Sequence, residues 1–581
     1  MSRMSRRLAA LALLGSLVVL VGWPLAATVL EACRAPQRLD RALTSLGLDD
    51  WALRIRRVWN IEPEPATGSV LDPAATARLL RETGGLARPA RLAVETLSLV
   101  FMTAALVLPP GILLALLLFR TDTWGRGLLL GILGIAAFVP LPLHATAWLG
   151  ALGNAGRMQA IGLRPVLVGR TGAAIIHALA CLPWVVFLVG VGLRTIEPEL
   201  EESAELDMPA GRVWGKVTLR RGVGAIAAAA VAVAVLTAGD MTVTDLLQVR
   251  TYAEEAYVQF TLGRGPADAA LVSVPPLIIL GGSIVLVARS LVRADPARLA
   301  SAFAPARLWK LGRWRVAAGA SLLLLVGNLV ALPLYSLVWR AGRVGGRARL
   351  GQPPAWSLAG LLGTLGFAAA ESWEPIQTSL LLAAGAATVT AVLAWVLAWV
   401  SRNSLTWQVL LLATLALTLA TPGPVAGMAL ELAYRWFPPI YDSPLIVVMA
   451  QSIRTLPYAL LILWPALRIL PGELLESAVL DGHGPWGQLW HVILPLSRRV
   501  LAAAWCVAFV LGFGELPATN LLQPPGITTI TFRIWTLLHT GVESHLAGVA
   551  LVTLAVLTIA ALSAVLGLRL LCRRIVEIPR N

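Results

Sequence analysis

The sequence predicts an all-α integral membrane protein of about twelve transmembrane helices, arranged in two homologous, parallel halves. Of its 581 residues, 57% are hydrophobic and 14% are charged, whereas a soluble domain is about 45–50% apolar and about 25% charged. Apolar runs of roughly 20 residues, enough to cross a bilayer core of about 30 Å, recur along the chain. One polar pattern also occurs twice between such runs. These three observations predict the class and the duplication.

The transmembrane helices are expected where the apolar runs lie. The runs are near residues 8–30, 92–119, 127–149, 172–193, 222–241, 269–288, 317–339, 377–400, 407–430, 443–467, 500–518 and 546–571. With the N-terminus inside, the inner segments hold 25 Lys and Arg, and the outer segments hold 11 once the long first outer loop is set aside. Because positive residues accumulate in cytoplasmic loops, we expect both termini in the cytoplasm.

The chain divides into four expected units. Residues 1–91 hold the first helix and an outer amphipathic segment, 92–292 the first half, 293–376 a cytoplasmic linker with the seventh helix and an outer loop, and 377–581 the second half. The first run has 23 apolar residues, more than the 7 to 15 of a usual signal-peptide core, so a retained helix is expected and a cleaved signal peptide is the alternative. The segment 31–91 is too polar to span and is expected on the outer membrane surface or as a cap.

The duplication is visible at an offset of 274 residues. This offset aligns Leu182-Pro183 with Leu456-Pro457, and gives 11 identities in the 26 positions from 182 to 207. Membrane composition inflates matches of Leu and Ala, but it does not align Pro, Arg, Glu and Asp. Because six spans separate the copies, both repeats face the same side, which makes the duplication parallel rather than inverted.

Two polar loops on the inner side, 196–221 and 469–499, each carry a helix, a turn and a second helix by their apolar spacing. In the second loop, Asp481-Gly482 is a turn signal because Gly tolerates a positive φ. A short amphipathic helix held outside the bilayer has an apolar face that needs a partner. A groove on another protein is one such partner, and the membrane surface is the alternative.

The two loops resemble the EAA loop of ABC importer permeases, whose pattern is roughly Glu-Ala-Ala, three residues, Gly and a later Leu-Pro. The second copy matches from Glu476 to Gly482 and again at Leu494-Pro495, whereas the first has Met208 for the Gly and Arg220 for the Pro. In that family the loop docks into a separate ATPase subunit. The resemblance therefore implies ATPase contacts by Glu202, Ser203, Ala204, Asp207, Glu476, Ser477, Ala478, Asp481, Gly482 and Leu489.

Fused permeases of this type are known among ferric iron importers and thiamine importers. Residues 514–526 resemble the Glu-Leu-Pro-Ala-Thr segment of iron permeases, with Gln523 in place of an Arg, and residues 239–252 resemble a second iron-permease segment. The resemblance thus implies a type I permease subunit of the inner membrane that moves ferric iron, received from a periplasmic binding protein, with an ATPase dimer on its cytoplasmic face. Thiamine or another small solute is the alternative cargo.

A pathway is expected between the halves. The candidate residues are Arg454, Pro183, Pro457, Asp240, Asp245 and Glu515. Proline removes a backbone donor and so kinks or opens a helix, and an arginine in mid-span is costly against lipid. Carboxylates where outer loops begin suit a hard cation. The alternatives are an arginine that bonds freed carbonyls and acids that cap helix ends or pair with outer Arg.

The chain is not expected to be an enzyme. A Walker A loop needs Gly-x-x-x-x-Gly-Lys-Ser/Thr, and around Gly215-Lys216 the first Gly is replaced by Ala210 and the hydroxyl by Val217. No cofactor or resident metal is expected. A nucleic-acid partner is not expected either, because the +15 net charge is spread over short loops. An outer group of His539, Glu543 and His545 is more simply a solvated loop than a metal site.

Two rival classes remain open. A secondary transporter also has about twelve spans in two halves, but it needs midplane relay carboxylates, and Arg454 is the one clearly midspan charge. A membrane transferase would use outer acids such as the adjacent Asp49 and Asp50, or Glu254 and Glu255, for acid and base chemistry. Neighbours in sequence usually point apart, so a solvated face is the simpler account of these pairs.

Overall fold

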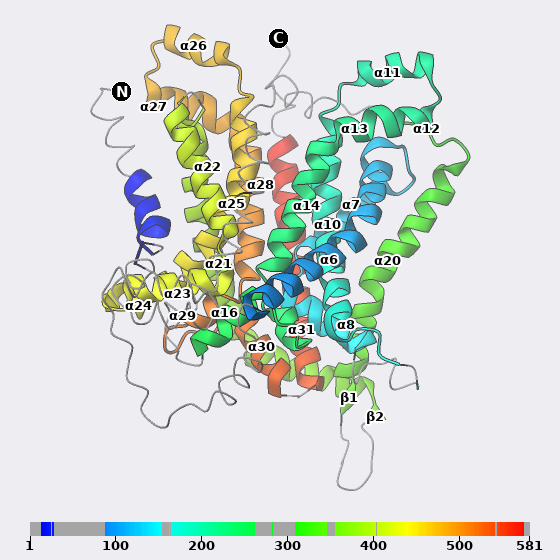
Figure 1. Ribbon diagram of the computed structural model, residues 1–581, viewed down its shortest axis with the longest axis vertical. Helices are drawn as coiled ribbons and strands as arrows, with labels where there is room; N and C mark the ends of the chain where they lie inside the picture. Colours follow the sequence, from blue (N-terminus) through cyan, green and yellow to red (C-terminus); the bar gives the residue numbers. More distant parts are fainter. Residues whose placement is uncertain are drawn as a thin grey trace.

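A computed structural model gives the fold (Figure 1) and describes residues 13–24, 26–27, 87–153, 162, 164–261, 282, 308–344, 355–402, 404–540 and 543–573. Within these residues the chain is helical apart from two isolated bridges and one antiparallel pair of short strands, β1 (Arg343–Val344) and β2 (Ala355–Trp356). The all-α membrane class predicted from the composition is confirmed.

The first half begins with α6 and ends with two short outer helices. Its helices are α6 (Ala87–Arg120), α7 (Arg126–Ala137), α8 (Leu141–Leu152), α10 (Gly169–Arg194), α11 (Pro198–Asp207), α12 (Ala210–Val213), the π-helix η2 (Trp214–Thr218), α13 (Leu219–Arg221), α14 (Val223–Ala238), α15 (Thr242–Leu246) and α16 (Tyr252–Thr261). A short apolar helix that includes the π-helix η1 (Val18–Gly22) precedes them, and α20 (Trp314–Ala341) follows.

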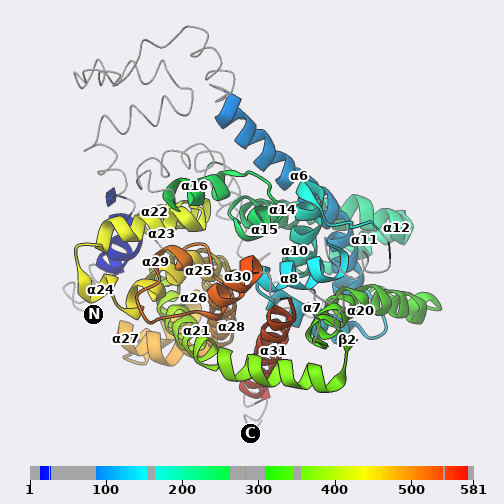
Figure 2. The same cartoon turned by 90° about the horizontal axis from the view of Figure 1, so that it is seen from below.

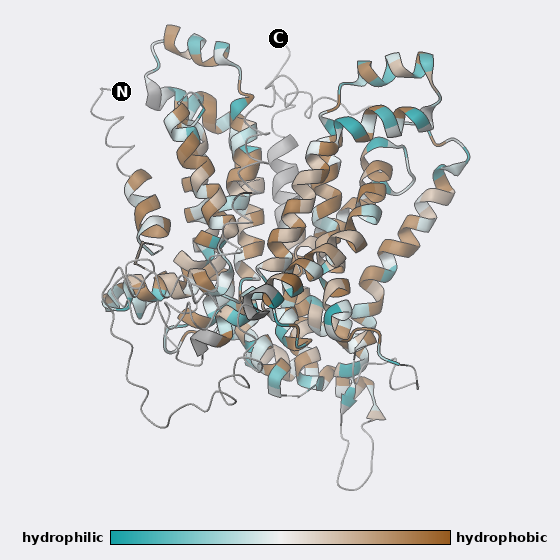
Figure 3. Cartoon of the chain, viewed as in Figure 1, coloured by the Kyte–Doolittle hydropathy of each residue, from teal (hydrophilic) through white to brown (hydrophobic). Residues whose placement is uncertain are grey.

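The second half repeats this order and is described as far as one further long helix, α31, whose equivalent in the first half lies outside the described residues. Its helices are α21 (Leu358–Val400), α22 (Leu405–Ala420), α23 (Gly423–Tyr434), α24 (Pro438–Tyr441), α25 (Pro444–Arg468), α26 (Gly472–Leu480), α27 (Pro485–Gln488), the π-helix η4 (Leu489–Ile493), α28 (Leu494–Phe513), α29 (Thr519–Leu522), α30 (Ile530–Thr540) and α31 (Glu543–Arg573). Figure 3 shows hydrophobic colour along α20 and α22 and hydrophilic colour on the loop helix α11.

Ten of the twelve predicted spans have a counterpart in the described residues. Seven helices are long and apolar enough to cross a membrane, and three further helix pairs qualify only as bent pairs. The predicted span 269–288 lies outside the described residues apart from Gly282, and the span 8–30 is described only between residues 13 and 27. The linker 289–316 and the outer segment 31–91 also lie mostly outside them.

The predicted spans at 127–149, 222–241 and 407–430 are not straight, which corrects the sequence expectation. The axes of α7 and α8 meet at 104°, those of α22 and α23 at 109°, and α14 makes an angle of 61° with the helical segment before it. Pro140 and Pro422 are the extended N-cap residues of α8 and α23, and Pro142 and Pro424 lie in the first turns. Proline is tolerated there, but it ends a preceding helix.

The eighth span also differs from its prediction. The α21 helix begins at Leu358 rather than near residue 377, and it continues through Pro375 to Val400. Ser357 caps its start, because its Oγ accepts a hydrogen bond from the Gly360 N–H at 3.0 Å. Part of the segment expected as an outer loop is therefore the beginning of this helix.

Each half has its own helical core, and one seam joins them. In the first half α10 packs between α6 and α14, and in the second half α25 packs against α21 and α28. Figure 2 shows α31 between α21 and α20, and α31 also contacts α8. A shared apolar cluster unites these elements, and its fully buried members include Leu337, Ile376 and Val549.

The two halves match in detail. The π-helices η2 and η4 lie 275 residues apart at equivalent positions, and the two bends at Pro140 and Pro422 lie 282 residues apart. The loop helices α11 and α26 both lie at the same end of the molecule, at the top in Figure 1. The parallel arrangement of two homologous halves is confirmed.

Candidate functional site

The second polar loop exposes an apolar helix face. Ala478 lies on the buried side of α26 and is 5% exposed, whereas Leu474, Val479 and Leu480 are exposed. The predicted turn is present, because Gly482 has a φ of +78°. The Gln488 side-chain N–H donates to the Leu475 carbonyl at 3.2 Å and ties α27 to α26.

The remaining residues predicted in this loop lie at its surface or within it. Glu476, Ser477 and Asp481 are exposed, and the Ser477 hydroxyl donates to the Glu473 carbonyl of its own helix. Leu489 does not lie on the exposed face: it opens η4 and packs against the core of the second half. The α26 face available to a partner is thus apolar and bordered by acids.

The first loop makes its turn differently. Met208 is extended, with φ −149° and ψ 150°, and its N–H donates to the Ala204 carbonyl. The EAA pattern implies a positive φ at this position, which is unfavourable for Met. The extended backbone of Met208 avoids it, and Pro209 follows directly. Glu202, Ser203 and Asp207 are exposed on α11, as is Leu206.

A buried ion pair anchors the first loop, and sequence reasoning missed it. Glu201 is fully buried and pairs with Arg120 at the end of α6. The same carboxylate accepts a hydrogen bond from the Thr218 hydroxyl at 2.7 Å. The only signal in the sequence was a basic residue at the end of an apolar run and an acid next to Glu202.

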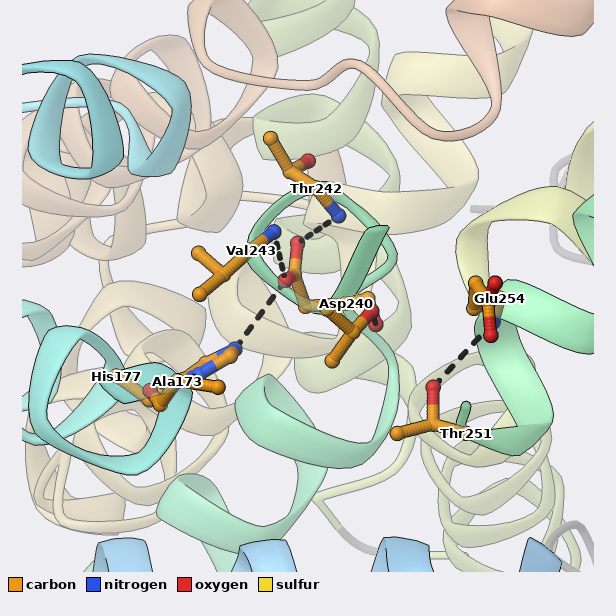
Figure 4. Close-up of polar contacts among 8 residues, drawn as sticks. Ala173, His177, Asp240, Thr242, Val243, Thr251 and Glu254 are labelled. Carbon is orange, nitrogen blue, oxygen red and sulfur yellow. Dashed lines mark hydrogen bonds and ion pairs between the residues drawn. The ribbon is translucent and has the colours of Figure 1, made fainter. Parts of the chain in front are cut away.

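Two predicted pathway acids cap helices on the opposite side of the molecule. The Asp240 carboxylate accepts hydrogen bonds from the Thr242 N–H at 3.0 Å and the Val243 N–H at 2.9 Å (Figure 4). The Glu515 carboxylate accepts from the Ala518 N–H at 2.8 Å and the Thr519 N–H at 2.9 Å. Both side chains are buried. This favours the capping alternative, and a direct role toward cargo stays a prediction.

Asp240 has a second partner in α10. The His177 Nε2 lies 3.2 Å from Asp240 Oδ2, and His177 Nδ1 lies 2.8 Å from the Ala173 carbonyl oxygen (Figure 4). The His177 ring therefore links Ala173 of its own helix to the carboxylate that caps α15.

Two polar contacts join the halves near these caps. Asp245 lies 3.1 Å from His539 Nε2 of α30, and the Asn520 side-chain amide donates to the Tyr257 hydroxyl of α16 at 2.9 Å. Asp245 and Asn520 occupy equivalent positions, 275 residues apart. In each half, therefore, the residue at this position contacts the opposite half.

The His539, Glu543 and His545 side chains go to separate partners. His545 Nε2 lies 2.8 Å from Glu371, and Glu543 lies 3.9 Å from Arg340. Among the residues that the structure describes, no group of three or more His, Cys, Asp or Glu side chains is placed to hold a metal ion.

Glu254 differs from the other outer acids. Its side chain is 7% exposed, and its Oε2 has no hydrogen-bond partner within the described part of the chain. Burial raises the pKa of Glu254 to about 6, an effect that Arg250 opposes and that the charges of Asp245 and Glu255 reinforce. Figure 4 shows Glu254 on α16, above Thr251.

Arg454 bonds across a bend. Its Nη1 donates to the Thr421 carbonyl at 2.7 Å, at the end of α22, and its Nη2 lies beside Gly239 of the first half. Pro183 and Pro457 are buried within α10 and α25, and both helices continue through them. Pro183 lines a small pocket against α7, α8 and α20. Arg454 therefore lies beside the opposite half.

Comparison with known proteins agrees with this architecture. Residues 379–576 match the family described as binding-protein-dependent transport system inner membrane component. The chain is similar to the thiamine transport system permease protein ThiP of Escherichia coli strain K12, with 26% identity over 473 residues, covering 75% of this chain and 81% of the relative.

Shorter similarities go to permeases named for other solutes. One is the probable sulfate transport system permease protein cysT of Marchantia polymorpha, 27% identical over 211 residues, or 33% of this chain and 67% of the relative. Another is the putative 2-aminoethylphosphonate transport system permease protein PhnV of Salmonella typhimurium, 28% identical over 138 residues, or 24% of this chain and 52% of the relative. The chain is therefore an all-α integral membrane protein that is similar in sequence to permease proteins of several transport systems.

Proposed function

We propose that this chain is the transmembrane permease subunit of an ATP-binding cassette importer of the inner membrane. Two copies of a separate ATPase dock on α11 and α26, and a substrate-binding protein docks on the opposite face. The observation that carries this proposal is a matched pair of leucines. Leu206 and Leu480, 274 residues apart, are 87% and 88% exposed at the same end of the molecule.

An exposed leucine outside the apolar spans costs free energy unless a partner covers it, about 1.5–3 kcal/mol for full burial. Two such leucines at equivalent positions fit two equivalent grooves, which two identical ATPase subunits provide. Glu202 and Glu476 border these faces and are exposed. They suit basic residues or helix N-termini on the partner.

Co-purification tests the docking. Leu480→Asp and Leu206→Asp place a charge in each apolar contact, and each is expected to reduce the amount of ATPase that co-purifies with the chain. Leu480→Met keeps an apolar side chain and is the matched control. Full retention of the ATPase by both Asp variants would contradict the docking proposal.

The cargo is a small solute, and thiamine is the better supported of the two cargoes considered. The thiamine permease aligns over most of both chains, whereas ferric iron rests on the resemblance of residues 514–526 and 239–252. Both Glu515 oxygens already accept backbone hydrogen bonds, which explains that segment without a metal. Uptake of labelled thiamine and labelled ferric iron, in cells with and without the chain, separates the two cargoes.

The transport pathway lies between the halves in this proposal. Arg454 beside Gly239 supports it, as do the contacts of Asp245 and Asn520 with the opposite half. Arg454→Cys tests it, because a pathway position reacts with aqueous thiol reagents in at least one transport state. In the proposed orientation, the two polar loops 196–221 and 469–499 and both termini lie in the cytoplasm. An Asp481→Cys variant labelled only from the cytoplasmic side tests that part.

A further inference from the structure

A groove opens beside the first polar loop. It has a volume of about 680 Å³. Its lining is Ile112 of α6, Gly215 and Lys216 of η2, Leu219 and Arg220 of α13, and Val223 and Ile226 of α14. Of these seven residues, two are positively charged and four have large apolar side chains.

The charged residues of the groove, with Leu219, come from the polar loop, and the other apolar residues come from membrane-spanning helices. Lys216 and Arg220 belong to the polar loop, whereas Val223 and Ile226 belong to a helix of the apolar span. The chain turns by 61° between these two parts. Ile112 lies about two turns before the inner end of α6. The groove therefore runs from the membrane surface into the apolar layer.

The positive charges of this groove have no acidic partner among the described residues. Lys216 and Arg220 are exposed, and neither forms an ion pair within the described residues. The nearby acid Glu201 is buried and already pairs with Arg120 and Thr218. Two free cations at the mouth of an apolar groove complement a molecule with an anionic head and a hydrocarbon chain.

We infer that this groove binds one anionic phospholipid. The phosphate lies between Lys216 and Arg220, and an acyl chain packs along Ile112, Val223 and Ile226. Basic residues at a membrane surface attract anionic lipids, and basic pockets between transmembrane helices bind lipid head groups. A zwitterionic lipid gains less, because its own ammonium group offsets the phosphate.

The site belongs to the first half alone. At the equivalent positions, 275 residues later, Lys216 is replaced by His491 and Arg220 by Pro495. Arg220 is also the residue that replaces the proline of the EAA pattern. The departure of the first loop from that pattern thus supplies half of the charge of the site, and a stoichiometry of one lipid per chain follows.

Native mass spectrometry of the purified full chain tests the site. The probes are phosphatidylglycerol and phosphatidylcholine with the same acyl chains. We expect one phosphatidylglycerol to bind about thirtyfold more tightly than phosphatidylcholine, since each of the two basic residues contributes a factor of about five. The variant Lys216→Gln/Arg220→Gln should lose this preference, and Lys216→Arg/Arg220→Lys should keep it.

The control removes the same charge from the same loop outside the groove. Arg212→Gln/Arg221→Gln is expected to keep the preference for phosphatidylglycerol. An equal loss in both charge-removed variants would show a diffuse surface effect and overturn the site. Displacement of the lipid by an equal concentration of glycerol 3-phosphate would show a site for free phosphate, and would also overturn it. Because lipid binding is measured without ATPase or cargo, this test is independent of the proposed function.

Discussion

Asp240 and Glu515 occupy equivalent positions, 275 residues apart, and each carboxylate closes the first turn of the short helix that follows it. The two side chains differ in length by one methylene group, and the bonded amides shift accordingly. Asp240 bonds residues two and three positions later, and Glu515 bonds residues three and four positions later. The capping function is therefore common to both halves although the residue is not.

Removal of these caps should destabilise the protein unequally. Asp240→Ala and Glu515→Ala each lose a cap, which costs about 1–2 kcal/mol. Asp240→Ala should cost more, because it also leaves the buried His177 ring without its carboxylate partner. Unfolding of the purified protein in detergent measures the difference. Asp442→Ala, at an exposed outer position, is the control, and equal behaviour of Asp240→Ala and Asp442→Ala would refute the ranking.

The ion pair of Glu201 and Arg120 should behave as a buried pair. Glu201→Leu removes the carboxylate partner of the buried Arg120 and is expected to lower the free energy of unfolding by about 3–5 kcal/mol. The equivalent residue of the second half is Leu475, so leucine fits this loop in principle. The double variant Glu201→Leu/Arg120→Leu should recover most of the loss. A double variant as unstable as the single one would show that the pair is not the cause.

The turn after α26 should require glycine, whereas the turn after α11 should not. Gly482 has a φ of +78° with open space around its Cβ position, so Gly482→Val is penalised by the backbone alone, by about 1–2 kcal/mol. Met208 is extended, and Met208→Val is expected to be nearly neutral. ATPase co-purification and thermal unfolding report both variants. Equal loss in the two variants would indicate that the loops make the same turn when the ATPase is bound.

Glu254 should make stability depend on pH. Its pKa is raised to about 6 in the folded protein, so the folded state binds more protons than the unfolded state between about pH 4.5 and pH 6. Stability therefore falls as the pH rises through this window and stays at the lower value above it. Glu254→Gln should stabilise the protein at pH 7, by up to about 2 kcal/mol, and remove this dependence.

The melting temperature between pH 4.5 and pH 8 measures the effect of Glu254→Gln. Glu374→Gln, which changes an exposed acid of α21, is the matched control and should leave the pH profile unchanged. An unaltered profile in Glu254→Gln would assign the titration to another group.

Hydropathy predicted the positions of the helices because apolar length is a local property of the sequence. It did not predict the bends at Pro140 and Pro422, since a run of apolar residues carries no information about the direction of the axis. The early start of α21 at Leu358 was missed for a related reason: Glu371 and Glu374 interrupt the apolar run, although they lie on a continuous helix.

The functional residues also divide into those that a local sequence pattern predicts and those that depend on contacts between distant helices. The two loops follow from a repeat that is visible in the sequence. The pairing of Glu201 with Arg120, separated by 81 residues, depends on how α6 and α11 meet in space. No local pattern shows that a carboxylate such as Asp240 faces a histidine in another helix.

The π-helices η2 and η4 carry a consequence for the history of the chain. A π-turn contains one residue more than the α-helical turn it replaces. Such an insertion rotates everything after it by about 100° about the helix axis, so gaining it separately in each half would require two costly rearrangements at the same place. One event before the gene doubled explains both. On this account, both halves inherited the extra residue from a single, half-sized chain.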